Sequence, residues 1–177
     1  INGAVTFKQD NAVFQPASSI KIDHLNINET DLGVLKFDIH GDDSLKKFTV
    51  ISNLENENLE SFDLNGGFEI VNKEPILDLN LKFNKFNLSV LNSLGGDVLS
   101  NIRGFASGNS SVEGNLKKPN INGRLYVDNA GLTIPYLNVD YGLSDKTIVD
   151  LTSEKFIFRK NTITDSKFDT KGILNGS

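Results

Sequence analysis

Apolar and polar residues alternate strictly through several short segments of this chain, and the alternation limits the folds open to it. The clearest segment is 77–84, in which Leu77, Leu79, Leu81 and Phe83 alternate with Asp, Asn and Lys. A period of two predicts a β-strand with one apolar and one polar face. Turn-forming Gly, Asn, Asp and Pro separate such segments at intervals of roughly 8–12 residues, which is typical of all-β chains. The short links favour antiparallel neighbours, because parallel pairing needs a long crossover.

One face of the predicted sheet should be apolar along most of its length, because the apolar residues keep one parity within each strand. Such a face can form the packed interior of a β-sandwich or the lining of an open groove, and alternation alone fits both. We assign the following residues to the lining of a groove that is available to an apolar ligand: Leu35, Phe37, Ile39, Phe62, Leu64, Phe68, Ile70, Leu77, Leu79, Leu81, Phe83, Leu125, Val127, Leu137, Val139, Phe156 and Phe158.

The parity of the apolar residues changes once near the N-terminus. Ile20 and Ile22 share one parity, and the next apolar residue, Leu25, takes the other. One inserted residue reverses the facing of every later residue in a strand. The change therefore predicts a β-bulge near Asp23–His24.

Residues 88–103 break the strand pattern. We expect a helical turn over 88–94, a stop at Gly95-Gly96, and a second short helix that Asp97 caps and that ends near Gly104. This insertion should cap one end of the apolar face; the alternative is an amphipathic element that touches lipid or a partner, although it lacks the Lys and Arg of membrane-surface helices. The prediction rests on apolar residues spaced three or four apart: Leu88, Leu91, Leu94, Val98 and Ile102.

The length of 177 residues suits one domain with a core of its own. We expect an all-β fold, a long curled antiparallel sheet that forms an open half-barrel groove over residues 1–177. Within it, 1–87 supply the N-terminal strands, 88–103 the short helical element and 104–177 the C-terminal strands. Because the sequence contains no Met and begins with Ile1, we interpret it as a fragment of a longer protein.

Composition excludes several functional classes. The formal net charge is −5 with both signs interspersed, whereas nucleic-acid binding usually requires a basic patch. The absence of Cys rules out a disulfide framework and a thiolate metal site. No apolar run approaches the ~20 residues of a membrane-spanning helix.

No catalytic or metal-binding arrangement is apparent. Asp38 and His40 project to the same side of a strand, but His24 is the only other histidine, and a metal site needs further ligands. The Gly-x-Ser-x-Gly motif of hydrolases and the phosphate-binding glycine loop are both missing. We therefore expect a protein that is not an enzyme and that uses no cofactor or metal.

Between residues 88 and 177, a Leu-rich helical segment is followed by glycine-spaced strands in a fixed order. This order and spacing resemble the C-terminal conserved domain of TamB, the translocation and assembly module subunit of Gram-negative envelopes. Residues 1–87 agree with that family only in their alternating character. The residues that carry the resemblance are Leu88–Ile102, Gly104–Gly108, Val112–Leu116, Pro119, Gly123–Val127, Ile134–Leu137 and Tyr141, with Asp165 and Gly172–Leu174 in a closing strand pair.

The resemblance implies a curled sheet of the β-taco type with an apolar interior, as in AsmA-like bridge proteins that transport lipid. It implies a periplasmic protein whose parent is anchored in the inner membrane of a Gram-negative bacterium and acts in outer-membrane biogenesis and protein secretion. The implied partners are phospholipid or unfolded outer-membrane protein strands, together with an outer-membrane barrel of the BamA/TamA type bound through the parent protein. The family offers no catalytic residues to transfer.

Three functions stay open at this point. The first is a conduit that shields lipid chains in a hydrophobic groove. The second is a chaperone whose open sheet edges pair with unfolded client strands. The third is a structural or adhesin-like β-sandwich binding module, which requires a second sheet packed against the first.

Overall fold

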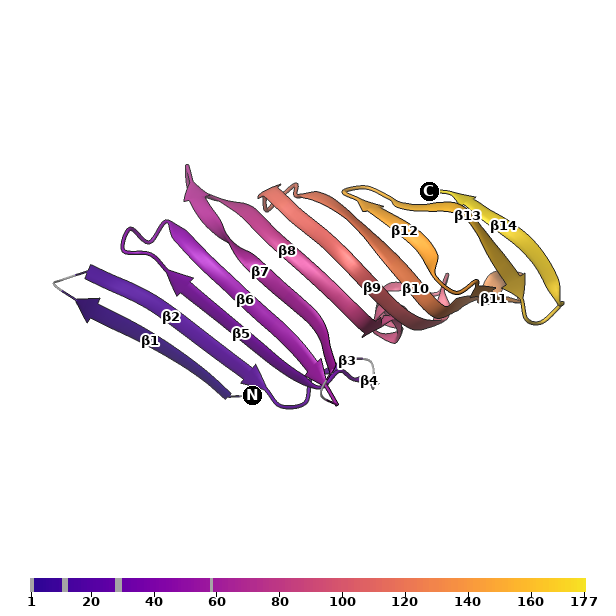
Figure 1. Cartoon of the computed structure of the whole chain (residues 1–177), viewed down its shortest axis with the longest axis horizontal. Coiled ribbons are helices and arrows are strands. Elements are labelled where there is room, and N and C mark those ends of the chain that lie inside the picture. Colours follow the sequence, from indigo (N-terminus) through magenta and orange to yellow (C-terminus); the bar gives the residue numbers. More distant parts are fainter. Residues whose placement is uncertain (1, 11–12, 28–29, 58) are drawn as a thin grey trace.

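The computed structural model describes residues 2–10, 13–27, 30–57 and 59–177. They form one twelve-stranded sheet with the order β1-β2-β5-β6-β7-β8-β9-β10-β11-β13-β12, in which β14 pairs with β13 and β10 also pairs with β12 (Figure 1). Every pairing in it is antiparallel. The strands are β1 (Asn2–Asp10), β2 (Val13–Ile22), β5 (Val34–Gly41), β6 (Lys47–Asn56), β7 (Leu59–Val71), β8 (Glu74–Asn87), β9 (Ser100–Asn115), β10 (Asn120–Ile134), β11 (Val139–Leu143), β12 (Thr147–Thr152), β13 (Phe156–Asp165) and β14 (Thr170–Gly176).

The sheet is open rather than closed into a barrel, which confirms the predicted fold class. Among the described strands, β1 pairs only with β2 at one end, and β14 pairs only with β13 at the other. The two-stranded hairpin of β3 (Asn26–Ile27) and β4 (Thr30–Asp31) is the only other sheet in the described part of the chain. The β-sandwich alternative is therefore wrong, because no second large sheet is present there to pack against the first.

Strand order follows chain order along most of the sheet, as tight links between antiparallel strands require. The exception is β11 and β12, which both run antiparallel to β10 and pair with its two halves. β11 and β12 therefore occupy a single strand position in the sheet, which the chain interrupts at residues 144–146. At this interruption, Thr147 donates its backbone N–H and its hydroxyl to the Ser144 carbonyl. β13 then pairs with both pieces and holds the interrupted row together.

β-Bulges occur in several central and C-terminal strands. The ladder slips by one residue beside Lys85 in β8, Asn129 in β10 and Lys160 in β13, and each of these residues has a positive φ near 50°. A bulge adds a residue to one strand and increases the local twist. The bulge at Lys85 is stabilised by its backbone N–H, which donates to Ser107 Oγ at 2.9 Å. It leaves Phe83 and Phe86 facing the same side.

The change of parity after Ile22 has a different cause from the one predicted. The chain leaves the sheet at residue 23, forms the β3–β4 hairpin and re-enters at Val34, so the predicted bulge near Asp23–His24 is wrong. The hairpin lies at one end of the strands, where Thr30 Oγ1 is 3.0 Å from Ser89 Oγ and the Asn56 side chain donates to the Asp31 carbonyl. Leu32, directly after it, is buried.

Helical structure is limited to two short 3-10 helices, η1 (Leu88–Leu94) and η2 (Pro135–Leu137). The first confirms the predicted turn over 88–94; the Asn87 side chain caps it by accepting a hydrogen bond from Ser89 N. The second helix predicted from Asp97 to Gly104 is wrong, because the chain turns after Gly95 and enters β9 at Ser100.

Candidate functional site

One face of the sheet is apolar from β2 to β13. Residues that pair across two antiparallel strands face the same side of the sheet. The pairing therefore shows which residues of successive strands share one face. Leu35 pairs with Leu54, Leu54 with Phe62 and Phe62 with Phe83. Farther along, the same face continues through Leu125, Val149 and Phe158.

The predicted groove residues lie on this face with one exception. Leu137 belongs to η2 rather than to a strand, and its side chain is exposed. Pro135 begins that helix and Asn138 ends it in a left-handed conformation, so the strand starts only at Val139. The bulge at Asn129 reverses the parity of β10, so that Ile134 lies on the apolar face. Val139 pairs with Ile134 and shares that face.

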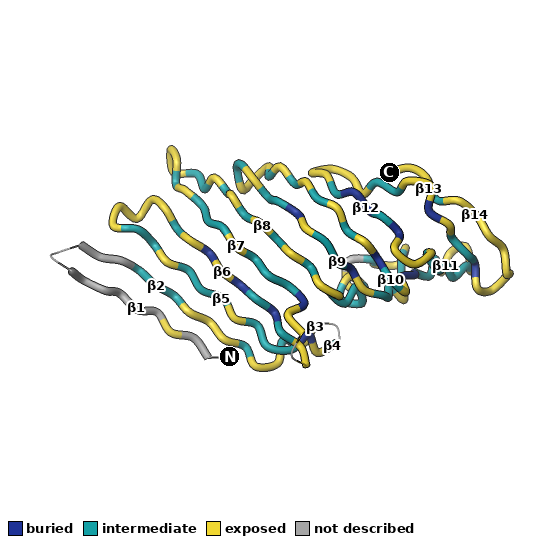
Figure 2. The backbone as a smooth tube through the Cα atoms, viewed as in Figure 1, coloured by how far each residue is buried: buried dark blue, intermediate teal, exposed yellow. Residues whose placement is uncertain are grey.

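The apolar face is partly exposed on β5, β7 and β8, whereas Val50 and Leu54 on β6 are buried. The predicted residues on β5, β7 and β8 are all intermediate in exposure (Figure 2). Phe48 and Phe68 stack with ring centroids 4.7 Å apart, and Phe62, Phe83 and Phe86 form a cluster with centroids 5.4 to 6.4 Å apart. Apart from two 3-10 helices, the β3–β4 hairpin and the connecting turns, the described residues all belong to this one sheet.

The C-terminal part of the same face is packed more tightly. Ala106, Val127, Ala130 and Val149 form a buried cluster, against which Leu88 of η1 packs. Thus η1 covers this end of the apolar face, as the capping interpretation of residues 88–94 predicts.

An apolar cleft of about 170 Å³ lies between η1 and the C-terminal strands. Four of the predicted residues line it, and Phe156 at its margin is 66 % exposed. A pocket without convergent polar groups can select for apolar character but not for a particular head group. The lining residues are Leu88, Leu91, Ile102, Arg103, Leu125, Val127, Ala130, Gly131, Leu132, Leu143, Val149, Leu151, Phe156 and Phe158.

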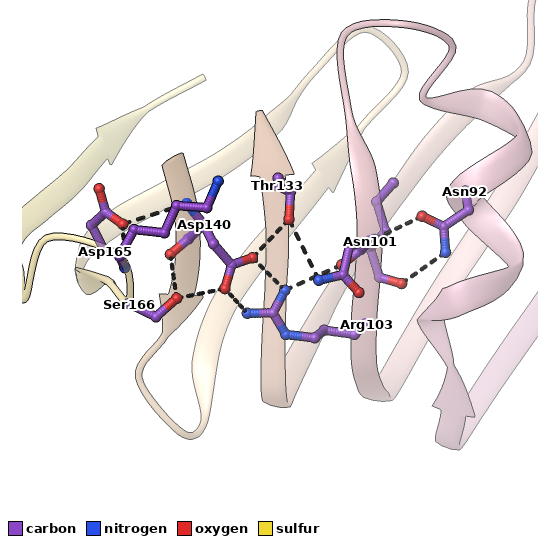
Figure 3. Close-up of polar contacts among 9 residues, drawn as sticks. Asn92, Asn101, Arg103, Thr133, Asp140, Asp165 and Ser166 are labelled. Carbon is purple, nitrogen blue, oxygen red and sulfur yellow. Dashed lines mark hydrogen bonds and ion pairs between the residues drawn. The ribbon is translucent and has the colours of Figure 1, made fainter. Parts of the chain in front are cut away.

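Asn92 holds η1 on the edge of β9 (Figure 3). Its side chain accepts from Ile102 N at 2.7 Å and donates to the Ile102 carbonyl at 3.0 Å and to the Ser89 carbonyl at 2.8 Å. These bonds take the place of the backbone pairing that β9 lacks at Ile102. They also set the position of Leu88 and Leu91 over the cleft.

Replacing Asn92 with alanine should loosen η1, because the Ile102 backbone groups then lose their partners at a cost of about 1–2 kcal/mol. We expect a lower urea midpoint and stronger fluorescence of a hydrophobic dye, since the cleft beneath η1 opens. Ser93→Ala is the matched control, as Ser93 is exposed and makes only a local bond to Val90. Equal dye binding by both variants would show that η1 does not cover the cleft.

An ion-pair cluster joins the strands that flank the cleft (Figure 3). Arg103 of β9 binds Asp140 of β11 through two parallel bonds of 2.9 and 3.0 Å. Thr133 donates to Asp140 Oδ1 at 2.7 Å, and Ser166 donates to Oδ2 at 2.6 Å. The Arg103 guanidinium, followed by the Ser166 and Thr133 hydroxyls, holds the pKa of Asp140 far below its usual range.

The opposite face of the sheet is polar. On it, Asp150 accepts from Arg124 Nε at 2.6 Å and from Arg159 Nε at 2.8 Å, and Arg124 with Arg159 lowers the pKa of Asp150. His40 also lies on this side and is exposed. Within the described residues, no three His, Asp or Glu side chains come together as a metal site would require.

Several residues of the apolar face are absent from the predicted set. Alternation alone could have placed four of them on this face, because they keep the apolar parity of their strands: Phe48, Val50, Val149 and Leu151. Phe86 is different, because the bulge at Lys85 shifts it onto the apolar face from a position whose parity predicts the polar one.

The comparisons with known proteins agree with this architecture. The sequence profile of the TamB C-terminal domain matches residues 52–173, just over two thirds of the chain. The match starts in β6, well before the region in which the motifs are apparent by inspection. No curated protein and no solved structure matches the chain.

Among the described residues, no helix has the length and apolar character needed to cross a membrane. The matched region contains the central and C-terminal strands, η1 and the apolar cleft, and it ends in β14. The chain therefore belongs to the TamB family of bacterial envelope proteins, which act in outer-membrane assembly.

Proposed function

We propose that the apolar face of this sheet shields the acyl chains of phospholipids during their passage between the inner and outer membranes. The observation that carries the proposal is an apolar face that a single-layered sheet leaves partly exposed on β5, β7 and β8, while Val50 and Leu54 of β6 are buried. Monomeric proteins rarely expose a contiguous apolar patch of more than a few hundred Å² unless something binds there.

The energetics suit transport better than tight binding. An acyl chain laid on this face gains about 0.8 kcal/mol for each CH2 group removed from water. The cleft residues supply no cluster of polar groups to hold a head group in one place. Binding of this kind discriminates little between lipids, and a chain can slide along the face.

The remaining parts of the proposal rest on family membership and on the lack of any catalytic arrangement in the sequence. The domain is not an enzyme and needs no cofactor. It works in the periplasm as part of a parent protein anchored in the inner membrane, and the parent binds an outer-membrane barrel of the BamA/TamA type. Its action contributes to outer-membrane biogenesis and protein secretion.

A second candidate occupant is an unfolded strand of an outer-membrane protein. The outer edge of β14 has no partner among the described strands, and an unpaired edge can add a strand by backbone hydrogen bonding. Crosslinks from β14 to a client polypeptide would favour this occupant, whereas crosslinks from the apolar side chains of β7 and β8 to lipid favour the conduit.

The direct test is lipid retention by the purified 177-residue chain. After incubation with phosphatidylethanolamine and phosphatidylglycerol vesicles and separation from them, native mass spectrometry should detect protein with one or more bound phospholipids. Both lipids should be retained to a similar extent, because the face recognises acyl chains rather than head groups. A chain that emerges free of lipid from both vesicles would overturn the proposal.

A further inference from the structure

The polar face of the sheet carries two parallel rows of side chains that cross five strands. The first row runs from Asp63 in β7 through Lys82, Asn109 and Arg124 to Asp150 in β12, each paired with the next. The second row lies two residues away along each strand, which is about 6.8 Å. It consists of Asn65, Asn80, Ser111, Asn122 and Thr152, again in direct register.

The two rows enclose a shallow hollow, which we name the polar trench. A cavity of about 640 Å³ is lined by both rows from β7 to β10, and a second of about 430 Å³ continues it to β13. The two share Asn122 and Gly123, so they are adjoining parts of one depression. Its floor is the backbone at Leu81, Ser110 and Gly123, and the side chains of Leu81 and Ser110 lie on the other face.

The side chains along the trench have unused hydrogen-bonding capacity. The amides of Asn65, Asn80, Asn109 and Asn122 and the hydroxyl of Ser111 make no hydrogen bond within the described part of the chain. The four asparagines are exposed. Each amide offers two donor hydrogens and a carbonyl acceptor. A ligand that fits the trench must therefore present hydrogen-bond donors and acceptors together, and must repeat them along its length.

The charges along the trench nearly cancel, because the three cations Lys82, Arg124 and Arg159 stand against the two carboxylates Asp63 and Asp150 and leave one positive charge. Asp63 and Lys82 are opposite in sign and lie side by side in the first row. Arg124 and Arg159 are both bound to Asp150. Little net charge is left in the trench to attract a phosphate or a polyanion. The net charge of the whole chain, −5, repels such an anion. The trench thus suits an uncharged ligand rich in hydroxyl and amide groups.

We propose that the polar trench binds a linear, uncharged oligosaccharide whose sugars carry acetamido groups. Hydroxyl and acetamido groups supply the mixture of hydrogen-bond donors and acceptors that the asparagine amides of the trench require. A sugar ring in an extended glycan is about as long as the strand spacing of ~4.8 Å, so successive sugars meet successive strands. No aromatic ring lies in the floor, and the affinity is correspondingly weak. The trench faces away from the apolar surface proposed for lipid, so the two sites are independent.

The test is a titration of the isotope-labelled 177-residue chain with chitohexaose, followed by two-dimensional amide NMR. We expect saturable shifts confined to the facing positions of β7 to β12. The variant Asn80→Ala/Asn122→Ala should raise Kd about tenfold, because each amide contributes one or two neutral hydrogen bonds. Asn84→Ala is the matched control, since Asn84 is an exposed asparagine of β8 outside the trench, and its Kd should equal that of the unmodified chain.

Three outcomes would overturn the proposal: no shifts with chitohexaose, shifts that do not saturate, or a Kd that the double substitution leaves unchanged. An oligogalacturonate of the same length is the charged comparison, and equal or tighter binding of it would also contradict the uncharged specificity. Lipid retention by the double variant should be normal, so failure of the trench can be distinguished from failure of the lipid proposal.

Discussion

Leu79→Asp should abolish phospholipid retention while leaving the sheet folded. Leu79 lies in the centre of the apolar face, paired with Gly66 of β7 and Val112 of β9, and it is only half-buried. A carboxylate there faces the acyl chain directly, and transfer of an unpaired charge to an apolar surface costs far more than the chain gains per CH2. Without lipid, the same carboxylate reaches water, because none of the described strands forms a second sheet over it.

The cost of this substitution to folding should be modest. A half-buried leucine contributes about 1–2 kcal/mol of burial, which corresponds to a decrease in Tm of roughly 2–8 °C for a chain of this size. The measurements are native mass spectrometry for bound lipid and circular dichroism for the fold. Asn84→Asp adds the same charge to the polar side of the same strand and should retain lipid fully.

Two results of the Leu79 experiment would count against the proposed groove. If Leu79→Asp unfolds the domain, the position is part of a closed core and no lipid path crosses it. If the folded variant still carries lipid, the acyl chain binds elsewhere on the molecule.

Asp140→Asn should destabilise the domain by about 2 kcal/mol at neutral pH, because two charge-assisted hydrogen bonds to the Arg103 guanidinium lose most of their strength. Asp140 is only 18 % exposed, so water replaces these bonds poorly. Urea unfolding followed by circular dichroism gives the free energy. Glu69→Gln removes one member of the exposed Lys47–Glu69 pair, whose atoms are 3.9 Å apart, and should leave the urea midpoint nearly unchanged.

The difference between the unmodified chain and Asp140→Asn should depend on pH in one direction. The native pKa of Asp140 lies below its unfolded value, so its contribution is complete above about pH 4 and decreases as the pH falls toward the native pKa. We therefore expect a constant difference in unfolding free energy from pH 5 to 7 and a shrinking one below pH 4. A difference that stays constant at pH 3 would assign the stabilisation to packing rather than to the ion pair.

Bulges and chain reversals limited what alternation could predict. The apolar spacing of Val98 and Ile102 suggested a helix, but Val98 lies in the turn before β9, and Asn101 adopts a positive φ beside a register shift in β9. The parity change after Ile22 suggested a bulge, whereas the chain leaves the sheet and returns. A bulge and an excursion from the sheet look the same in the local sequence, because either one reverses the parity of the residues that follow.

Between bulges, the sequence by itself determined which side chains share a face, since alternation with a period of two survives any arrangement of the strands. It also carried the order of glycines and apolar residues by which the TamB family is detected. Whether the apolar face is covered was decided only by the tertiary structure, because a sandwich and an open sheet present the same alternation. The pairing of Arg103 with Asp140 and the alignment of Asn80 with Asn122 are likewise tertiary, as register between strands depends on turns and bulges that act over the whole sheet.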